Sequence, residues 1–431
     1  MILLGLFKKK QFNPLIRDGI LFTVFSFFNS GVNFLLIILL AKYIPPAGYG
    51  ELNLFNTFVT LLGAFISLST IGYISIAFFK RSEKEFPFFV TGSLFITLIT
   101  FSVICVCLFC FSDVFETILG LKILYLILGL VISFMQAFCT AVLDIWRIKE
   151  KVLIYGIFSV LIVILNFLLS IYFIISCNQG WQGRVYAQFI ATFLFFIFTV
   201  FFLICKGYII LKVPDWNTLK ILLCFGVPLI PHLASLWLRQ GADRYIINYY
   251  YTTAEVGIFS FALNFSNLIN VIGNAFNATN SVYIYKNLAK GYTADVKNSF
   301  VRQNRLMLFL FLAITLFVIL VVTIGIPLFF LQYMDTIKYI IPLCLSSFFQ
   351  CLYLLFVNYL FYYNKTRQLM YITFLLSVLQ VVASSIVTKY EVLYTAYLSL
   401  LISFLTFILV YLYSKSILKK NETSIESKQN Y

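Results

Sequence analysis

The stretch that decides the fold is FGVPLIPHLASLWLRQGADRYIINYYYTTAEVGIFS, residues 225–260. It places two prolines, the one histidine of the chain, two arginines and an aspartate in a run otherwise apolar enough to cross a bilayer. Ionisable side chains at membrane depth cost roughly 2.5–3.5 kcal/mol each on insertion scales, so they usually face a polar cavity on a transport path. Pro228 and Pro231 each remove a backbone donor, which predicts a hinge there. The stretch is typical of a transporter helix.

The composition places the whole chain in a membrane. Hydrophobic residues make up 62% of its 431 residues and charged residues 11%, against about 25% charged in soluble domains. The net charge of +15 could suggest a nucleic-acid partner. The basic residues, however, form short clusters between apolar runs, which is the positive-inside arrangement, so we expect no nucleic acid. The opening MILLGLFKKK carries its charges after its apolar residues, the reverse of a signal peptide, so the first span is expected to direct insertion.

Apolar runs of about 20 residues recur along the chain. They predict an all-α integral membrane protein with twelve transmembrane helices, near residues 20–42, 52–79, 86–111, 121–143, 153–176, 184–205, 221–250, 256–285, 305–331, 338–363, 368–388 and 392–414. With the N-terminus inside, most of the 31 Lys and Arg residues fall on the inner side. Both termini are therefore predicted to be cytoplasmic.

An internal repeat divides the chain into two halves. AKYIPPAGYGELNLF (41–55) aligns with NYYYTTAEVGIFSFA (248–262), which pairs Gly50 with Gly257, and SIAFFKRSEK (75–84) aligns with SVYIYKNLAK (281–290). Six spans per half predict parallel repeats related by a pseudo-twofold axis along the membrane normal. The predicted parts are a six-helix lobe (1–205), a cytoplasmic linker (206–220), a second six-helix lobe (221–414) and a cytoplasmic polar tail (415–431), which we expect to be disordered.

Cofactor and catalytic signals are weak. Of the nine cysteines, Cys105, Cys107 and Cys110 come closest to a metal motif, but they lie in an apolar span without His or acidic partners. We therefore expect no metal site and no disulfide framework. The sequence has no Gly-rich nucleotide loop and no paired carboxylates suited to acid–base chemistry. The prediction is a protein without a cofactor that is not an enzyme.

The charged residues of the seventh span are the first candidate site. In the repeat alignment Arg239, Asp243 and Arg244 fall opposite residues within span 1, so they are expected in the outer half of one continuing helix, with His232 nearer mid-membrane. Arg239 and Asp243 are four residues apart and can pair on one helix face. Arg244 lies over Gln240 and keeps an unpaired positive charge. The alternative is interfacial snorkelling, with both arginines reaching for water or lipid phosphate.

Uncharged polar stripes on two other spans complete the candidate site. At helical spacing, one face of span 8 and one face of span 1 carry asparagines, namely Asn267, Asn270, Asn274 and Asn277 in span 8 and Asn29 and Asn33 in span 1. Such amides suit a hydrated groove that binds sugar hydroxyls. They can equally bridge neighbouring helices by hydrogen bonds.

Two stretches resemble a known family. LLAKYIPPAGYGELNLF (39–55) resembles the region that opens polysaccharide exporters of the MATE-like MOP superfamily, although Lys42 replaces an Arg and Ile44-Pro45 replaces Leu-Gly. Residues 225–262 resemble the corresponding second-half region more closely. The residues on that pattern are Pro228, Pro231, Trp237, Asp243, Arg244, Gly257 and Ser260. The chain is thus similar to Wzx-type O-antigen or capsule repeat-unit flippases.

The resemblance implies a function in the bacterial cytoplasmic (inner) membrane. The substrate would be an oligosaccharide on undecaprenyl pyrophosphate, moved to the outer leaflet by alternating access, with membrane lipid around the carrier. Arg239 and Arg244 would attract the pyrophosphate or acidic sugars, Asp243 would orient Arg239, and the span 8 asparagines would meet sugar hydroxyls. Coupling to H+ or Na+ is expected to involve Asp243 or His232. Expected partners are a polysaccharide polymerase and a chain-length regulator.

Three other functions compete with this one. A multidrug or cation antiporter of the same superfamily usually carries a carboxylate inside its first lobe, whereas spans 1 to 6 have none at mid-helix. A lipid II flippase typically has more spans than the twelve predicted. A polytopic polysaccharide polymerase or ligase would need larger outer loops and a catalytic constellation.

Overall fold

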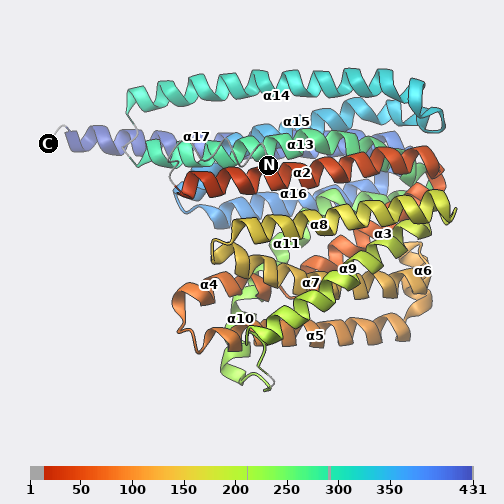
Figure 1. Ribbon diagram of the computed structural model, residues 1–431. Helices are drawn as coiled ribbons and strands as arrows, with labels where there is room; N and C mark the ends of the chain where they lie inside the picture. The colour runs from red at the N-terminus through yellow and green to blue at the C-terminus, as the bar shows by residue number, and fades with distance from the viewer. Residues whose placement is uncertain (1–13, 211, 290–292, 430–431) are drawn as a thin grey trace, which may run out of the picture. The chain divides into compact units, whose positions relative to one another are not determined.

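The computed structural model describes residues 14–210, 212–289 and 293–429, and within them the side chains except those of 14–20, 64, 232, 294 and 420–429. Helices joined by short connections make up this part of the chain (Figure 1). The helices of the first half are α2 (Pro14–Tyr43), α3 (Pro46–Phe65), α4 (Tyr73–Lys80), α5 (Phe86–Cys110), α6 (Ser112–Leu119), α7 (Ile123–Ile148), α8 (Val152–Ile171) and α9 (Gly180–Cys205).

The second half continues in the same way. Its helices are α10 (Trp216–Gly226), α11 (Ile230–Gln240), α12 (Ala242–Tyr250), α13 (Thr253–Leu288), α14 (Ala294–Phe329), α15 (Ile337–Tyr362), α16 (Thr366–Val387) and α17 (Val392–Gln429). Short 3₁₀ turns lie at η1 (Thr70–Gly72), η3 (Val227–Leu229) and η4 (Leu331–Thr336), and a π turn, η2 (Tyr172–Ser176), ends α8. Hydroxyl and carboxylate caps begin several helices, since Asp215 accepts from the Thr218 amide and Thr252 from the Glu255 amide.

The described residues contain eleven helical segments long and apolar enough to cross a membrane. The protein is therefore a multi-pass membrane protein, and the predicted all-α membrane fold is confirmed. Two predicted spans differ, the second and the seventh. Residues 52–79 do not form one helix, because α3 ends at Phe65 and the chain turns through η1 before α4. Leu68 and Ser69 have positive φ values of 45° and 59°, and this conformation cannot continue a right-handed helix.

The seventh span is also interrupted. The chain passes from α10 through η3 into α11, and then breaks again at Gly241 before α12. Pro228 lies in the 3₁₀ turn and Pro231 in the first turn of α11, so the two missing backbone donors coincide with the first break. The break lies where the two prolines predict a weak helix.

The chain forms two compact units. One comprises residues 1–44 and 54–230, and the other residues 45–53 and 231–431. The division in the second half falls between Ile230 and Pro231, ten residues beyond the predicted linker, because α10 packs against α5 and η1 of the first unit. There Gly92 lies close to Leu222, and Gly226 lies close to the Leu68 carbonyl oxygen.

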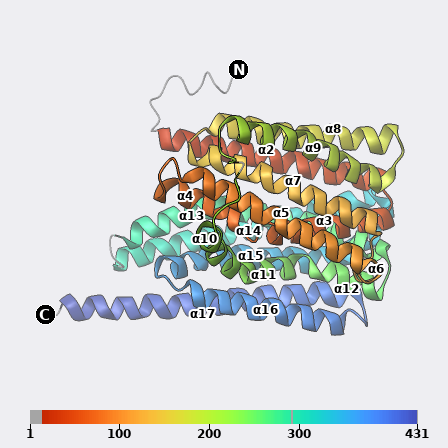
Figure 2. The ribbon, with the colours of Figure 1, turned by 90° about the horizontal axis from the view of Figure 1, so that it is seen from below.

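Within the first unit α8 packs against α2 and α9, and α7 against α5 and α9 (Figure 2). Within the second unit α15 packs against α13, α14 and α17, and α16 packs against α17 and α12. These two bundles position the polar residues considered below.

The C-terminal region differs from the prediction of a disordered tail. Helix α17 continues past residue 414 to Gln429. Its sequence from Val392 to Gln429 contains neither Gly nor Pro, so no helix-breaking residue terminates the helix.

Candidate functional site

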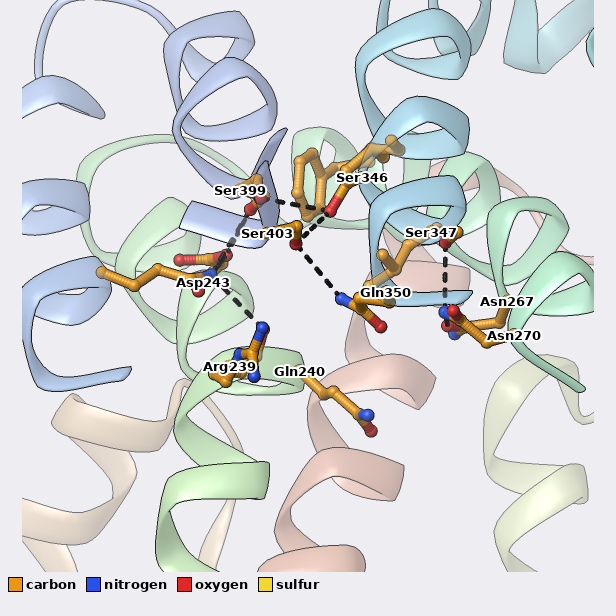
Figure 3. Close-up of a pocket in the computed structure, with 14 residues that line it drawn as sticks. Arg239, Gln240, Asp243, Asn267, Asn270, Ser346, Ser347, Gln350, Ser399 and Ser403 are labelled. Atoms are coloured by element: carbon orange, nitrogen blue, oxygen red, sulfur yellow. Dashed lines mark hydrogen bonds between the residues drawn. The ribbon is translucent and has the colours of Figure 1, made fainter. Parts of the chain in front are cut away.

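A polar cavity lies inside the second unit. Six helices, α11 to α13 and α15 to α17, contribute its walls. Its lining, shown in Figure 3, consists of Arg239, Gln240, Asp243, Phe259, Leu263, Asn267, Asn270, Leu343, Ser346, Ser347, Gln350, Gln380, Ser399 and Ser403. Most of these side chains are polar although their helices are apolar. Polar groups gathered in this way inside a membrane protein line a cavity rather than face lipid.

Asp243 is the most constrained member of this cavity. Its side chain is only 5% exposed. Oδ2 accepts hydrogen bonds from Gln380 Nε2 at 2.9 Å and from Ser399 Oγ at 3.2 Å, while Oδ1 accepts one from Ser384 Oγ at 2.7 Å. Three donors from α16 and α17 therefore surround one carboxylate of α12. Charge-assisted hydrogen bonds of this kind are the stronger ones in proteins.

Arg239 lies beside Asp243 without pairing to it. Its Nη2 donates to Thr406 Oγ1 of α17 at 3.4 Å, and its carbonyl oxygen accepts from Gln380 Nε2 at 3.3 Å. The sequence predicted an Arg239–Asp243 pair at helical spacing. Among the described residues no ion pair joins them, because Gly241 interrupts the helix between the two and the Asp243 oxygens are taken by α16 and α17. The expectation of one continuing helix is wrong for the same reason.

Arg244 points elsewhere. Its Nε donates to Ser260 Oγ of α13 at 3.0 Å, and its Nη1 donates to the Gln240 carbonyl oxygen at 2.7 Å. Its side chain is 9% exposed and does not line the cavity. The guanidinium caps the last carbonyl of α11 and links α12 to α13, so it holds the break at Gly241 in place. The sequence predicted that Arg244 lies over Gln240. In the structure the guanidinium contacts the backbone carbonyl oxygen of Gln240.

The cavity is small. It offers about 30 Å³ to water-sized molecules, and one water needs about 10–15 Å³ by the same measure. In this structure it therefore has room for a few water molecules or a small ion, and no room for a sugar ring.

The span 8 asparagines divide into two groups. Asn267 and Asn270 line the cavity, and Asn270 Nδ2 donates to Asn267 Oδ1 and to Ser347 Oγ of α15. Asn277 instead accepts from Asn358 Nδ2 of α15 at 2.7 Å, and Asn274 donates to the carbonyl oxygen of Asn270 in its own helix. The first pair suits a cavity, whereas Asn277 bridges helices.

The span 1 asparagines and the histidine lie in other places. Asn29 Nδ2 donates to Ser159 Oγ of α8 at 3.2 Å, so it bridges two helices. Asn33 lines a second cavity, in the first unit. His232 lies in α11, but its side chain is outside the described residues.

Sequence reasoning missed the partners of Asp243. Gln380 is the one amide of α16 beyond its first turn, and Ser384 lies four residues further along the same helix face. A lone Gln in an apolar span was the available signal. Its pairing with α12 could not be read from the sequence, because the two residues are 137 positions apart.

Comparisons with known proteins show the family of the chain. Residues 15–283 match the family model described as polysaccharide biosynthesis protein. Lsg locus putative protein 1 of Haemophilus influenzae is 24% identical over 391 residues, covering 88% of this chain and 93% of that protein. An uncharacterized membrane protein of the same organism is 26% identical over 395 residues, covering 90% and 94%.

Solved structures show the fold. A multidrug resistance MATE family transporter of the MOP superfamily, in an inward-facing conformation, matches with a TM-score of 0.78 at 16% identity, covering 94% of this chain and 99% of that one. At this identity the likeness concerns the architecture, which is the two-lobed helical fold of MATE transporters.

Proposed function

Because this chain belongs to the polysaccharide biosynthesis protein family and has the fold of MATE transporters, we propose that it is a flippase for lipid-linked oligosaccharides. It would move undecaprenyl-pyrophosphate-linked repeat units across the bacterial inner membrane by alternating access, in the synthesis of O-antigen or another surface polysaccharide such as that of lipopolysaccharide. Its role is binding and translocation rather than catalysis. Both termini lie in the cytoplasm in this proposal, and a polymerase and a chain-length regulator act on the exported units.

One observation carries the proposal. The cavity of the second unit brings a guanidinium, a buried carboxylate and several amides and hydroxyls together inside apolar helices. Such groups are costly at membrane depth and are characteristic of substrate and ion pathways. A family that acts on polysaccharides, a transporter fold and an intramembrane polar cavity fit translocation of a polar, anionic substrate.

Within this cavity Arg239 and Asp243 have different tasks. Arg239 keeps guanidinium donors for an anionic group, since its guanidinium has five N–H donors and its bond to Thr406 is a long one of 3.4 Å. Asp243, held by Gln380, Ser384 and Ser399, is placed to take up H+ or Na+. The room for a small ion, and not for a sugar, favours this coupling role. Because Asp243 is the second residue of α12, two positions after Gly241, a change at the carboxylate would affect the break between α11 and α12.

The test is a deletion strain compared with the same strain carrying the wild-type gene. Lipid-linked oligosaccharides and surface polysaccharide are extracted from both. Complete repeat units retained on undecaprenyl pyrophosphate, with no polymer at the surface, are expected in the deletion strain and identify translocation as the missing step. Normal polymer without such retention rejects the proposal. Ethidium efflux measured in the same two strains distinguishes multidrug transport, and turnover of lipid-linked sugar by the purified protein distinguishes a polymerase.

A further inference from the structure

A second cavity lies entirely within the first unit. It has a volume of about 530 Å³ and is lined by α2, α3, α7 and α9, through Asn33, Leu36, Ile37, Leu40, Asn56, Val59, Thr60, Gly63, Gln136, Arg184 and Gln188. This volume falls in the range of roughly 300–1,000 Å³ that small-molecule sites occupy. The cavity in the second unit is far smaller, so the two have different capacities.

Arg184 is the one charged residue of this lining. The sequence placed it at the outer end of the sixth span, but α9 begins four residues earlier, at Gly180, and the side chain is only 9% exposed. Its Nη1 donates to Asn166 Oδ1 and, at 3.3 Å, to Ser170 Oγ, both of α8. A guanidinium has five N–H donors, so others remain for a ligand. In the part of the chain that the structure describes, no acidic residue lines this cavity to balance the charge.

Gln188 lies one turn further along α9 and lines the same cavity. Its side chain is 9% exposed, and its Oε1 is buried without a hydrogen-bond partner among the described residues. An unsatisfied buried acceptor is unfavourable, so the site is complete only when a donor reaches it. Arg184 needs an acceptor, preferably an anion, whereas Gln188 needs a hydrogen-bond donor. A ligand that suits both carries an oxyanion and a hydroxyl group.

The remaining lining agrees with a hydroxylated ligand. Asn33, Asn56 and Gln136 contribute amides from three different helices, and Thr60 contributes a hydroxyl. Leu36, Ile37, Leu40 and Val59 form the apolar part of the wall. Amides that both donate and accept, set beside an apolar surface, match the alternating hydroxyl and C–H faces of a sugar ring.

We propose that the first-unit cavity binds an acidic sugar, with the carboxylate on Arg184 and hydroxyls on Gln188 and the neighbouring amides. That this sugar belongs to the transported oligosaccharide rests on the proposed function; the binding itself does not. A pyrophosphate shares the oxyanion chemistry. It lacks the ring hydroxyls that the amide lining would bind, and so fits the site less completely.

The test measures binding to the full-length protein in nanodiscs of zwitterionic lipid, by isothermal titration calorimetry. The probes are D-glucuronate, D-glucose and inorganic pyrophosphate. Glucuronate is expected to bind at least tenfold more tightly than glucose, and Arg184→Gln is expected to remove that preference while leaving glucose binding unchanged. Lys212→Gln removes one exposed positive charge outside the helices and serves as the matched control, with no change expected.

Gln188→Leu keeps the test decisive if Arg184→Gln fails to fold. Because Gln188 Oε1 has no partner, its removal leaves no buried group unpaired, and the variant is expected to fold and to bind glucuronate several-fold more weakly. Equal binding of glucuronate and glucose by the wild type, or unchanged glucuronate binding in both variants, overturns the proposal. Pyrophosphate bound more tightly than glucuronate, and lost in Arg184→Gln, overturns the acidic-sugar assignment and points to the lipid carrier.

These results are separable from the flippase test. Accumulation of lipid-linked repeat units in the deletion strain with no glucuronate binding by the purified protein leaves translocation standing and removes this site. Glucuronate binding that depends on Arg184, with no accumulation in the deletion strain, leaves the site standing and removes the flippase function.

Discussion

Gly50 and Gly257 lie against each other with their backbones in contact. A Cβ atom on Gly50 would lie 3.0 Å from the Gly257 nitrogen and 1.8 Å from the Thr253 carbonyl oxygen, and one on Gly257 would lie 1.9 Å from the Pro46 carbonyl oxygen. The first turns of α3 and α13 thus cross at a distance that only glycine permits. The two glycines are the pair that the internal repeat aligns, so equivalent positions of the two repeats meet each other.

The neighbouring Tyr49 explains why residues 45–53 belong to the second unit. Its ring is 1% exposed and packs edge-on against Phe261 and Tyr333, and its hydroxyl accepts from Asn264 Nδ2 at 2.7 Å. This short segment of the first half is therefore anchored among side chains of the second half.

Gly50→Ala is expected to destabilise the protein strongly. The added methyl group overlaps a backbone oxygen, which cannot rotate away as a side chain could, so the cost is expected to reach or exceed the roughly 1–3 kcal/mol of ordinary overpacking. Gly325→Ala is the matched control, because nothing lies within 4 Å of its Cβ position in α14. Thermal unfolding in detergent checks both variants. Equal melting temperatures for Gly50→Ala and the wild type would contradict the close crossing.

The two arginines are expected to respond differently to substitution. Arg244→Gln removes the buried bond to Ser260 and the partly buried bond to the Gln240 carbonyl oxygen, and should destabilise the protein by about 1–3 kcal/mol together with loss of export. Arg239→Gln leaves those bonds intact and should reduce export with little change in stability, because the side chain lines the cavity.

Surface polysaccharide in a complemented deletion strain and the melting temperature of each purified variant separate the two cases. A fully stable Arg244→Gln protein that cannot export would assign Arg244 a direct role in transport. Undiminished export by Arg239→Gln would remove Arg239 from the substrate path.

The helical type of the elements and most of the predicted spans followed from the sequence, because a long apolar run is what a helix needs to cross a bilayer. The predicted span 52–79 did not, since the chain turns through η1 between α3 and α4. The breaks followed only in part. Pro228 and Pro231 predict the interruption at η3. Gly241 does not predict the second one, because an isolated Gly costs a helix only about 1 kcal/mol and usually leaves the helix intact. The lost Arg239–Asp243 pairing is a direct consequence of that second break.

The sequence predicts that residues of the seventh and eighth spans line a polar cavity, but not which residues of other helices join them there. Asp243, Arg239, Asn267 and Asn270 do line one cavity, since charged and amide side chains in an apolar span favour a common polar interior. Gln380 and Ser384 could not be assigned to it, because α16 meets α12 only through tertiary packing. Arg184 was not a candidate, because the predicted sixth span begins at residue 184 and so puts Arg184 at its outer end, whereas α9 begins four residues earlier, at Gly180.

Asn277 is expected to stabilise the fold rather than bind substrate. Asn358 is 2% exposed and its Nδ2 donates to Asn277 Oδ1, so Asn277→Ala removes a partly buried interhelical hydrogen bond at a cost of about 1–2 kcal/mol. Asn274→Ala is the control, because Asn274 donates only within its own helix and is exposed. Thermal unfolding should show a lower melting temperature for Asn277→Ala alone. Equal melting temperatures would indicate that this bond contributes nothing.

Asp243→Asn addresses the coupling role of the carboxylate. The amide is nearly the same shape, so the fold should survive with a loss of about 1–3 kcal/mol, because one amide group faces donors that the carboxylate accepted. What should disappear is the response of transport to an imposed Na+ or H+ gradient, since the neutral side chain neither takes up a proton nor attracts a cation as a carboxylate does.

The measurement uses protein reconstituted in vesicles with a fluorescent lipid-linked oligosaccharide, with each gradient imposed in turn. Asp335→Asn is the matched control, because Asp335 is an exposed carboxylate of the same unit and lines neither cavity. Wild-type and Asp335→Asn proteins should translocate faster under one of the gradients, and Asp243→Asn should translocate at the same low rate with or without it. Since Gln380 contacts the same carboxylate oxygen as Ser399, Gln380→Ala should alter the gradient dependence without removing it. If Asp243→Asn responds to the gradient as the wild type does, the carboxylate is a structural acceptor for α16 and α17, and the coupling ion binds elsewhere.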